Sequence, residues 1–326
     1  MTTAQVSPMT PEQVAERGAT VLDEVHRHVI GLRTVSTLAL ATVLAGGHVL
    51  FEDLPGLGKT MLCKAMSTAV GLEFRRIQGT PDLMPSDITG SSIFDPAARQ
   101  FEFHPGPVFT GLLLADEINR TSPKTQSALL EAMAEKQVTV EGRTRPLPRP
   151  FHVFATSNPV EFEGTYPLPE AQLDRFMVRL SMGYPTHAHE QDIVAARLLR
   201  RSEDFVAAQV MTSDELLAAQ AGIEQLEVDP DIVEYAARFV EASRDHIAVE
   251  IGGSPRATLA LILVSRAMAA LAGRAYVLPE DVKQVLAPML SHRMILTADA
   301  WAQGITPEQI TSTLLERVPA PATTRS

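Results

Sequence analysis

The sequence predicts an α/β fold with a parallel sheet, followed by a helical domain, and three observations favour this class. Between residues 48 and 184, short β-branched or aliphatic runs alternate with helical patterns, which is typical of a parallel sheet covered on both faces. After Tyr184 and Pro185, every remaining periodic segment has the spacing of a helix. The chain has 326 residues, which suits about two domains at roughly 150 residues each.

These observations divide the chain into four parts. We expect a disordered N-terminus at residues 1–10, an α/β core at 11–184, a helical domain at 185–318 and a disordered tail at 319–326. The core begins with a helix near residues 11–28.

Five apolar runs are expected to form the strands of the core. They cover residues 48–52, 74–78, 112–116, 151–156 and 177–181. A helix-forming run at 61–70 follows the first strand. A second helix is predicted at 122–136, where apolar residues such as Leu129 and Met133 recur at helical spacing.

The helices of the second domain are recognised by the residues that begin them. Proline suits the first helical position, and a small polar residue before it can cap the helix. These signals are Pro230 before a helix at 231–245, Ser254 and Pro255 before a helix ending at Ala272, Pro279 before the next, and the capping box Thr306 to Gln309 before the last.

The composition excludes several classes of protein. With 45% hydrophobic and 21% charged residues, the chain is typical of a globular protein and not of a disordered one. Its longest apolar runs, such as 259–264, are too short to span a membrane, and no basic export signal occurs in the first twenty residues. The single cysteine, Cys63, cannot form an internal disulfide. We therefore expect a cytoplasmic protein without membrane insertion.

The strongest motif follows the first predicted strand. Glycines at 56 and 58 are followed by Lys59 and Thr60, and then by a helix. Glycines let backbone N–H groups approach a phosphate chain, a helix N-terminus attracts anions, lysine neutralises the β- and γ-phosphates, and a hydroxyl can bind Mg²⁺. The loop therefore predicts a nucleotide site for ATP with Mg²⁺. The residues expected to contact the nucleotide here are Asp53, Pro55, Gly56, Leu57, Gly58, Lys59, Thr60 and Met61. Asp53 stands where the strict pattern has glycine.

A second motif ends the strand at 112–116. Asp116 and Glu117 follow this apolar run, at the sheet edge where open α/β folds bind ligands. Taken alone, such a pair can also mark an ordinary strand end. Beside a phosphate loop, Asp116 and Thr60 are expected to hold Mg²⁺, and Glu117 is expected to polarise the attacking water.

Three further polar residues stand out by position. Asn158 directly follows a predicted strand and can orient the water or contact the γ-phosphate, although turn asparagines are common. Arg175 precedes the last strand, where it could also pair with Asp174. Arg256 lies in the first turn of a helix, where a cation opposes the helix dipole, so we expect it to serve a ligand.

The sequence motifs support a resemblance that covers most of the chain. In their order and spacing, they resemble those of the MoxR family of AAA+ ATPases, from about residue 11 to 317. The stretches that carry it are EDLPGLGKT, TPDLMPSDITG, FHPGPVF, LLLADEINRTSPKTQSALLEAM, FATSNPVEFEGTYPLPEAQLDRF and GGSPRATLAL. The resemblance implies a three-layer αβα P-loop core with a five-stranded parallel sheet, and a helical lid. It also implies ATP hydrolysis at the subunit interfaces of a ring, usually a hexamer, and a chaperone-like role on partners that often carry von Willebrand factor A domains.

The resemblance also implies roles for individual residues. The loop ending in Thr60 matches Walker A, in which the family also has aspartate at the position of Asp53. The other matches are Asp116 and Glu117 to Walker B, Asn158 to sensor 1, Arg175 to the arginine finger, Arg256 to sensor 2, Val29, Ile30 and Gly31 to the adenine pocket, Tyr184 with Pro185 to the hinge, residues 80–90 to the helix-2 insert and residues 137–145 to the pre-sensor hairpin.

Two other functions remain open. A nucleotide switch without catalysis would bind ATP and barely hydrolyse it, but Glu117, Asn158 and Arg175 argue for hydrolysis. A nucleic-acid motor or clamp loader is disfavoured by the net charge of −11. The arginines of the segment 137–149 also lack interleaved aromatic residues.

Overall fold

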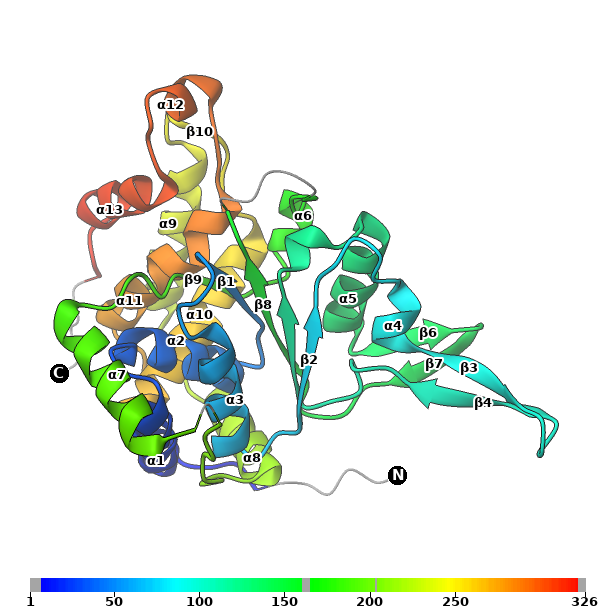
Figure 1. The fold of residues 1–326 in the computed structure, drawn as a ribbon. Coiled ribbons are helices and arrows are strands. Elements are labelled where there is room, and N and C mark those ends of the chain that lie inside the picture. Colours follow the sequence, from blue (N-terminus) through cyan, green and yellow to red (C-terminus); the bar gives the residue numbers. More distant parts are fainter. Residues whose placement is uncertain (1–6, 160–164, 203, 322–326) are drawn as a thin grey trace.

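The central feature of the fold is a parallel sheet with the strand order β2-β5-β8-β1-β9 (Figure 1). The computed structural model describes residues 7–159, 165–202 and 204–321. The strands are β1 (Val49–Glu52), β2 (Phe74–Gln78), β5 (Leu112–Asp116), β8 (His152–Ser157) and β9 (Val178–Leu180). All four neighbouring pairs run parallel. The predicted five-stranded parallel sheet is confirmed. No end of a strand differs from its predicted position by more than one residue.

The two faces of the sheet are buried under different elements, which gives a three-layer core. Successive side chains of a strand point to opposite faces. On β5, Leu112 and Leu114 join one hydrophobic cluster, while Leu113 and Ala115 join the other. The first cluster includes residues of α1 (Pro11–His28), α2 (Arg33–Leu44) and α3 (Lys59–Ala69), and the second includes those of α5 (Pro123–Glu135). The inner strand β5 is therefore buried on both faces.

Two antiparallel hairpins project beyond the sheet (Figure 1). One consists of β6 (Gln137–Val140) and β7 (Arg143–Pro146), in agreement with the hairpin expected there. The other follows α4 (Pro85–Thr89) and consists of β3 (Gly90–Asp95) and β4 (Gln100–Pro105). This second hairpin was not expected, because the predicted insert covers only residues 80–90, although β4 alternates polar and aromatic residues.

The C-terminal part is built mainly of helices. They are α7 (His187–Arg200), α8 (Ser213–Glu224), α9 (Pro230–Arg244), α10 (Pro255–Leu271), α11 (Pro279–Leu290), α12 (Ala298–Ala302) and α13 (Pro307–Arg317), after a short α6 (Glu170–Leu173). The expectation that all of this part is helical is wrong at one place. β10 (Val249–Ile251) and β11 (Ile295–Leu296) form a small antiparallel sheet. Strands of two or three residues are too short to show a period of two in the sequence.

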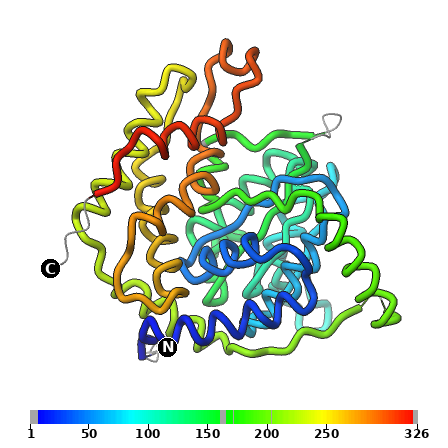
Figure 2. The backbone as a smooth tube through the Cα atoms, turned by 90° about the vertical axis from the view of Figure 1, so that its left-hand side faces the viewer, coloured from blue at the N-terminus to red at the C-terminus, as the bar shows by residue number. Residues whose placement is uncertain are grey.

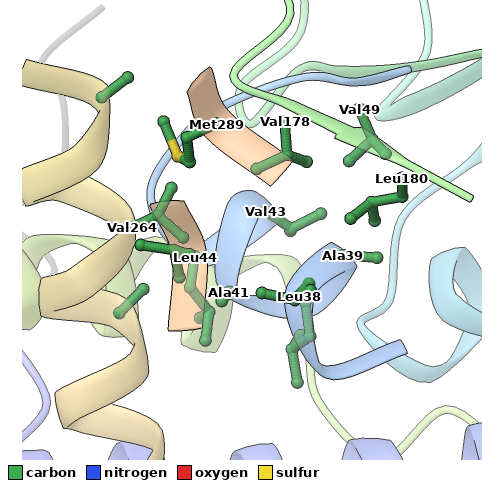
Figure 3. Close-up of a cluster of buried hydrophobic side chains, with 14 of the residues drawn as sticks. Leu38, Ala39, Ala41, Val43, Leu44, Val49, Val178, Leu180, Val264 and Met289 are labelled. Atoms are coloured by element: carbon green, nitrogen blue, oxygen red, sulfur yellow. The ribbon is translucent and has the colours of Figure 1, made fainter. Parts of the chain in front are cut away.

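The helical lid packs beside the first two helices of the chain, as Figure 2 shows for the blue and orange segments. Figure 3 shows α2 between the sheet and the lid. Leu44 of α2 lies in the same cluster as Val178 of β9, Val264 of α10 and Met289 of α11. One hydrophobic cluster thus extends from the sheet into the lid, and the lid lies against the side of the core.

The described part of the N-terminus differs from the disorder predicted for residues 1–10. Met9 donates its backbone N–H to Ala218 O at 3.0 Å, and Thr10 caps α1 through a capping box with Gln13. Residues 1–6 and 322–326 lie outside the described residues. Among the residues that the structure does describe, no helix is long and apolar enough to cross a lipid bilayer.

Candidate active site

The phosphate loop connects β1 to α3 and leaves the start of that helix open. Gly58 is the N-cap residue, with φ 86°, a left-handed conformation that favours glycine. No side chain caps the helix there. The first N–H groups of α3 therefore remain available to an anion, and the helix dipole adds partial positive charge at the same point.

Lys59 is held by the loop itself. Its ammonium group donates to the carbonyl oxygens of Asp53 at 2.8 Å and Leu54 at 2.9 Å. Burial lowers the pKa of Lys59, while the nearby carboxylates of Asp53 and Asp116 act in the opposite direction. The positive charge of Lys59 thus lies at the N-terminus of α3 and is partly shielded from water.

The structure explains why aspartate suits position 53. The Asp53 carboxylate accepts hydrogen bonds from the Ser181 hydroxyl at 2.8 Å and from the backbone N–H of Met182. Both partners follow β9, directly before the segment of Tyr184. Asp53 therefore ties the beginning of the phosphate loop to the neighbouring strand, a role that glycine could not perform.

Asp116 and Glu117 lie at the carboxyl end of β5, as predicted. The Thr156 hydroxyl donates to Asp116 Oδ1 at 2.7 Å and accepts from the Glu117 N–H at 2.7 Å, so β8 fixes both residues. Glu117 has φ 54°, an uncommon conformation for a residue with a side chain. Residues held in such conformations cluster at functional sites.

Several contacts to this acidic pair were missed by the sequence reasoning. Arg76 on β2 donates to Asp116 Oδ2 from Nη2 at 2.5 Å and from Nε at 3.1 Å. Gln78 donates to Glu117 Oε2 at 2.8 Å, and Arg120 donates to the same oxygen at 3.1 Å. The signal that could have found Arg76 and Gln78 was their place at the end of β2, because this strand ends at the same sheet edge as β5.

Gly79 was missed as well, and it is required by a close approach. A Cβ atom at this position would lie 2.1 Å from Glu117 O, and the Gly79 N–H donates to Asp116 O at 2.7 Å. Only glycine lets the end of β2 pass this close to the acidic pair.

A single cavity of about 510 Å³ brings together most of the predicted phosphate and metal residues. From the predicted set, it is lined by Asp53, Pro55, Gly56, Gly58, Lys59, Thr60, Met61, Asp116, Glu117 and Asn158. Asn158 is buried, and its backbone oxygen accepts from the Asn119 side chain at 3.1 Å. The size suits a small-molecule ligand.

The donor set of this cavity fits Mg²⁺. Thr60 and Asp116 offer one hydroxyl and one carboxylate, both oxygen ligands. The described residues contain no cluster of three or more His, Cys, Asp or Glu side chains that could hold a metal alone. Magnesium typically uses one or two protein oxygens and completes its shell with phosphate oxygens and water, so the set fits a metal that arrives with a nucleotide.

A second cavity of about 650 Å³ adjoins the other side of the phosphate loop. Its walls include the predicted adenine-pocket residues Val29, Ile30 and Gly31, together with Tyr184 and Leu57. Gly56, Gly58, Pro55 and Met61 line both cavities. This more apolar space is therefore continuous with the loop, as a base next to its phosphates requires.

Arg175 and Arg256 lie elsewhere. They line a third cavity of about 220 Å³, together with Asp174 and Arg293. Arg175 donates to Leu130 O at 2.8 Å, while Asp174 pairs with Arg293 at 2.7 Å, so the alternative ion pair between Arg175 and Asp174 is not formed. Arg256 does not line the phosphate cavity of its own subunit, and α10, which it begins, packs against α1 and α2.

The fold and the site define a P-loop ATPase of the AAA class. Residues 48–178 match the family described as "ATPase family associated with various cellular activities (AAA)", and residues 241–314 match the AAA lid domain. The phosphate loop, the acidic pair and four of the five strands fall within the first match, and β9 begins at its last residue.

Three comparisons over nearly full length narrow this class to one family. A Bacillus subtilis protein, the uncharacterized YeaC, is 47% identical over 92% of this chain and 93% of its own length. The chaperone MoxR1 of Mycobacterium tuberculosis is 41% identical, over 91% of this chain and 81% of its own. The crystal structure of a proposed ATPase from Cytophaga hutchinsonii superposes with a TM-score of 0.89 at 38% identity, over 96% of this chain and 97% of that one. The chain belongs to the MoxR family of AAA+ ATPases.

Proposed function

We propose that this protein hydrolyses ATP with Mg²⁺ in an oligomeric ring, which is a hexamer in our proposal, and remodels or activates a partner protein complex. The observation that carries the proposal is the cavity shared by Lys59, Thr60, Asp116, Glu117 and Asn158. It supplies a cation, two metal-binding oxygens, a base and an amide around one space, which is the set that phosphoryl transfer needs.

The residues divide the chemistry among themselves. Bound Mg²⁺ would neutralise charge on the phosphates, and Thr60 and Asp116 would hold it. Lys59 and the N–H groups at the start of α3 bind the β- and γ-phosphates. The Glu117 carboxylate orients the attacking water and accepts its proton, while the Asn158 amide helps to fix the water or the γ-phosphate. The cavity beside Val29 and Tyr184 takes the adenine.

The placement of Arg175 and Arg256 supports a site completed by a neighbouring subunit. Both line one cavity with Arg293, and Asp174 is the acidic residue of its lining. Such a cluster of guanidinium groups suits a phosphate group. In the proposed ring, these arginines reach the γ-phosphate of the adjacent subunit and stabilise its charge in the transition state. Neither would act on its own phosphate loop.

The partner is proposed to be a protein, for example one with a von Willebrand factor A domain. The acidic balance of the chain still disfavours a nucleic-acid motor, and a location in the cytoplasm suits the use of ATP. Arg145, one of the hairpin arginines, packs its guanidinium 3.7 Å from the centre of the Phe103 ring and is engaged within the molecule. On the other hairpin, Phe94 and Phe101 are exposed, which suits an apolar protein contact.

The test is the variant Glu117→Gln, which removes the base and leaves Asp116 intact. ATP binding should persist within a few-fold of the wild type, and turnover should fall by about 10²- to 10⁴-fold, the usual contribution of a general base. Hydrolysis near the wild-type rate would mean that the base lies elsewhere. The trapped ATP state is then the bait for capturing partner proteins. Stimulation of the wild-type ATPase by the captured protein, and not by DNA or RNA, would separate the proposal from the nucleic-acid alternative.

A further inference from the structure

The carboxylate of Asp116 has partners on both of its oxygens. Thr156 donates to Oδ1, and Arg76 donates to Oδ2 with two nitrogens, at 2.5 and 3.1 Å. The contact of Arg76 is charge-assisted, and both of its nitrogens meet the same carboxylate oxygen. The guanidinium thus covers the oxygen that faces away from Thr156.

Arg76 also lies within the phosphate cavity. It lines that space together with Lys59 and Thr60. A magnesium ion needs its oxygen ligands at about 2.0–2.1 Å and repels a nearby guanidinium. A cation bound between Thr60 and Asp116 and an arginine paired with Asp116 therefore compete for the same negative charge.

We propose that Arg76 is a built-in counter-ion that occupies Asp116 and must give way when the divalent cation binds. The inference rests on the proposed function, because it takes the cation to arrive with the nucleotide. Displacement of the Arg76 side chain would affect more residues than Asp116. Arg76 Nη2 also donates to Gln78 Oε1 at 2.7 Å, and Gln78 in turn donates to Glu117. The metal ion therefore changes the hydrogen-bond partners of both acidic residues.

The position of Arg76 favours a displaceable partner over a structural one. Its side chain is 47% exposed on the edge strand β2, and exposed ion pairs contribute little to stability. Long, exposed side chains also change rotamer quickly. The neighbouring Arg75 offers a matched comparison, since it pairs with Glu73 at 2.9 Å and does not line the cavity.

The experiment measures Mn²⁺ affinity directly. The full-length protein is held in excess over a non-hydrolysable ATP analogue, so that all nucleotide is bound, and Mn²⁺ is titrated while free Mn²⁺ is followed by electron paramagnetic resonance. Arg76→Gln should bind Mn²⁺ about two- to fivefold more tightly than the wild type, the range that corresponds to losing a competing exposed ion pair. Arg75→Gln, which removes the same charge from the same strand, should match the wild type.

The outcomes separate this inference from the proposed function. Unchanged or weaker Mn²⁺ affinity in Arg76→Gln would overturn the competition, even when nucleotide binding is normal. An equal gain in Arg75→Gln would assign the effect to net charge and also overturn it. If Arg76→Gln folds poorly by circular dichroism, Arg76→Met provides another uncharged side chain, for which the expectation is the same. A wild type that binds no nucleotide would overturn the proposed function, and this inference with it.

Discussion

The side chain of Lys59 is held in position by the phosphate loop and is expected to contribute strongly to ATP binding. Its ammonium group is satisfied by two carbonyl oxygens of the phosphate loop, so it stays in place without a ligand. We predict that Lys59→Ala lowers ATP affinity by at least tenfold, because an ionic hydrogen bond to phosphate is worth about 1.5–3 kcal/mol. Equilibrium binding of a fluorescent ATP analogue measures this. Lys283→Ala, on α11 and outside the lining of the cavity, is the control. Affinity within twofold of the wild type in Lys59→Ala would contradict the assignment.

Gly79 gives a second prediction for a single residue. The added methyl group of Gly79→Ala would meet the backbone of Glu117, so β2 and the acidic pair must separate by a few tenths of an ångström or more. Misplacing a catalytic group by about 1 Å can cost roughly 10²-fold in rate. We therefore expect a loss of about 10- to 100-fold in ATP turnover with a smaller change in ATP affinity. Gly46→Ala is a comparison for backbone strain without a clash, since no atom lies near its missing Cβ while its φ of 74° disfavours a side chain. Full turnover in Gly79→Ala would refute the steric argument.

The junction between β9 and the lid depends on Arg293. Its guanidinium donates to Asp174 Oδ1 at 2.7 Å and to Phe176 O at 2.9 Å, and its side chain is almost fully buried. We predict that Arg293→Ala lowers the free energy of unfolding by about 3 kcal/mol, because the partly buried Asp174 carboxylate and the buried Phe176 carbonyl lose their donor. Arg238→Ala is the control. Its exposed pair with Glu234 should contribute less than about 1 kcal/mol. Urea unfolding of both variants checks the difference, and similar losses would contradict it.

The strands β1 and β8 meet at a pair of buried histidines with a predicted pH effect. Burial lowers the pKa of His48 to about 3 and that of His152 to about 4. His48 Nδ1 accepts from the Val153 N–H at 2.9 Å, which fixes the neutral form. The unfolded chain binds protons below about pH 6.5 and the folded chain does not, so stability is full above this pH and falls as the pH decreases.

At pH 5 the loss should be about 2 kcal/mol for each histidine, relative to pH 7.5. Urea unfolding at the two pH values measures it. His48→Asn keeps an acceptor near Nδ1 and cannot titrate, so its stability should depend on pH less steeply by about this amount. An identical pH dependence in wild type and variant would show that His48 does not contribute.

At the scale of the whole molecule, the proposed ring makes the rate of ATP hydrolysis depend on assembly of the subunits. Since Arg175 does not line the phosphate cavity of its own subunit, turnover per subunit should rise with protein concentration until the proposed ring is complete. A cation supplied by a neighbour can be worth about 10³- to 10⁵-fold in rate. Lys59→Ala and Arg175→Ala should each be nearly inactive, and their mixture should regain part of the activity, because an intact Lys59 then faces an intact Arg175.

Mixed rings must be demonstrated independently, for example by cross-linking two differently tagged variants. If such rings form and remain as inactive as their components, Arg175 does not act between subunits. A specific activity independent of concentration, down to the monomer measured by mass photometry, would lead to the same conclusion.

Most of the sheet and the phosphate site could be predicted from the sequence, because both depend on local order. Buried strands appear as apolar runs, and the run from Gly56 to Thr60 is a local signal. The residues that were missed depend on pairing between distant segments. Arg76 and Gln78 reach the site only through the parallel register of β2 with β5, and β10 pairs with β11 across some forty residues. Neither relation leaves a periodic pattern.

The place of Arg256 could not be predicted for a related reason. The sequence indicates a helix and its first turn, but the side of the core on which α10 packs depends on the shapes of two distant helices, α1 and α2. A lid beside the core moves Arg256 to the cavity of Arg175.

The hydrophobic cluster that joins α2 to α10 and α11 has a mechanical consequence. Bending the lid away from the sheet would open a dry interface and expose Leu44, Val264 and Met289 to water, at about 25 cal/mol for each Å² of apolar surface. We therefore expect the subunit to move as one rigid body, without opening and closing of the lid against the core. In the proposed ring, the flexible joints would lie between neighbours, where the arginines of one subunit would meet the phosphates of the next. Work done by hydrolysis would then appear as tilting of whole subunits, and the hairpins at their far ends would travel the longest distance.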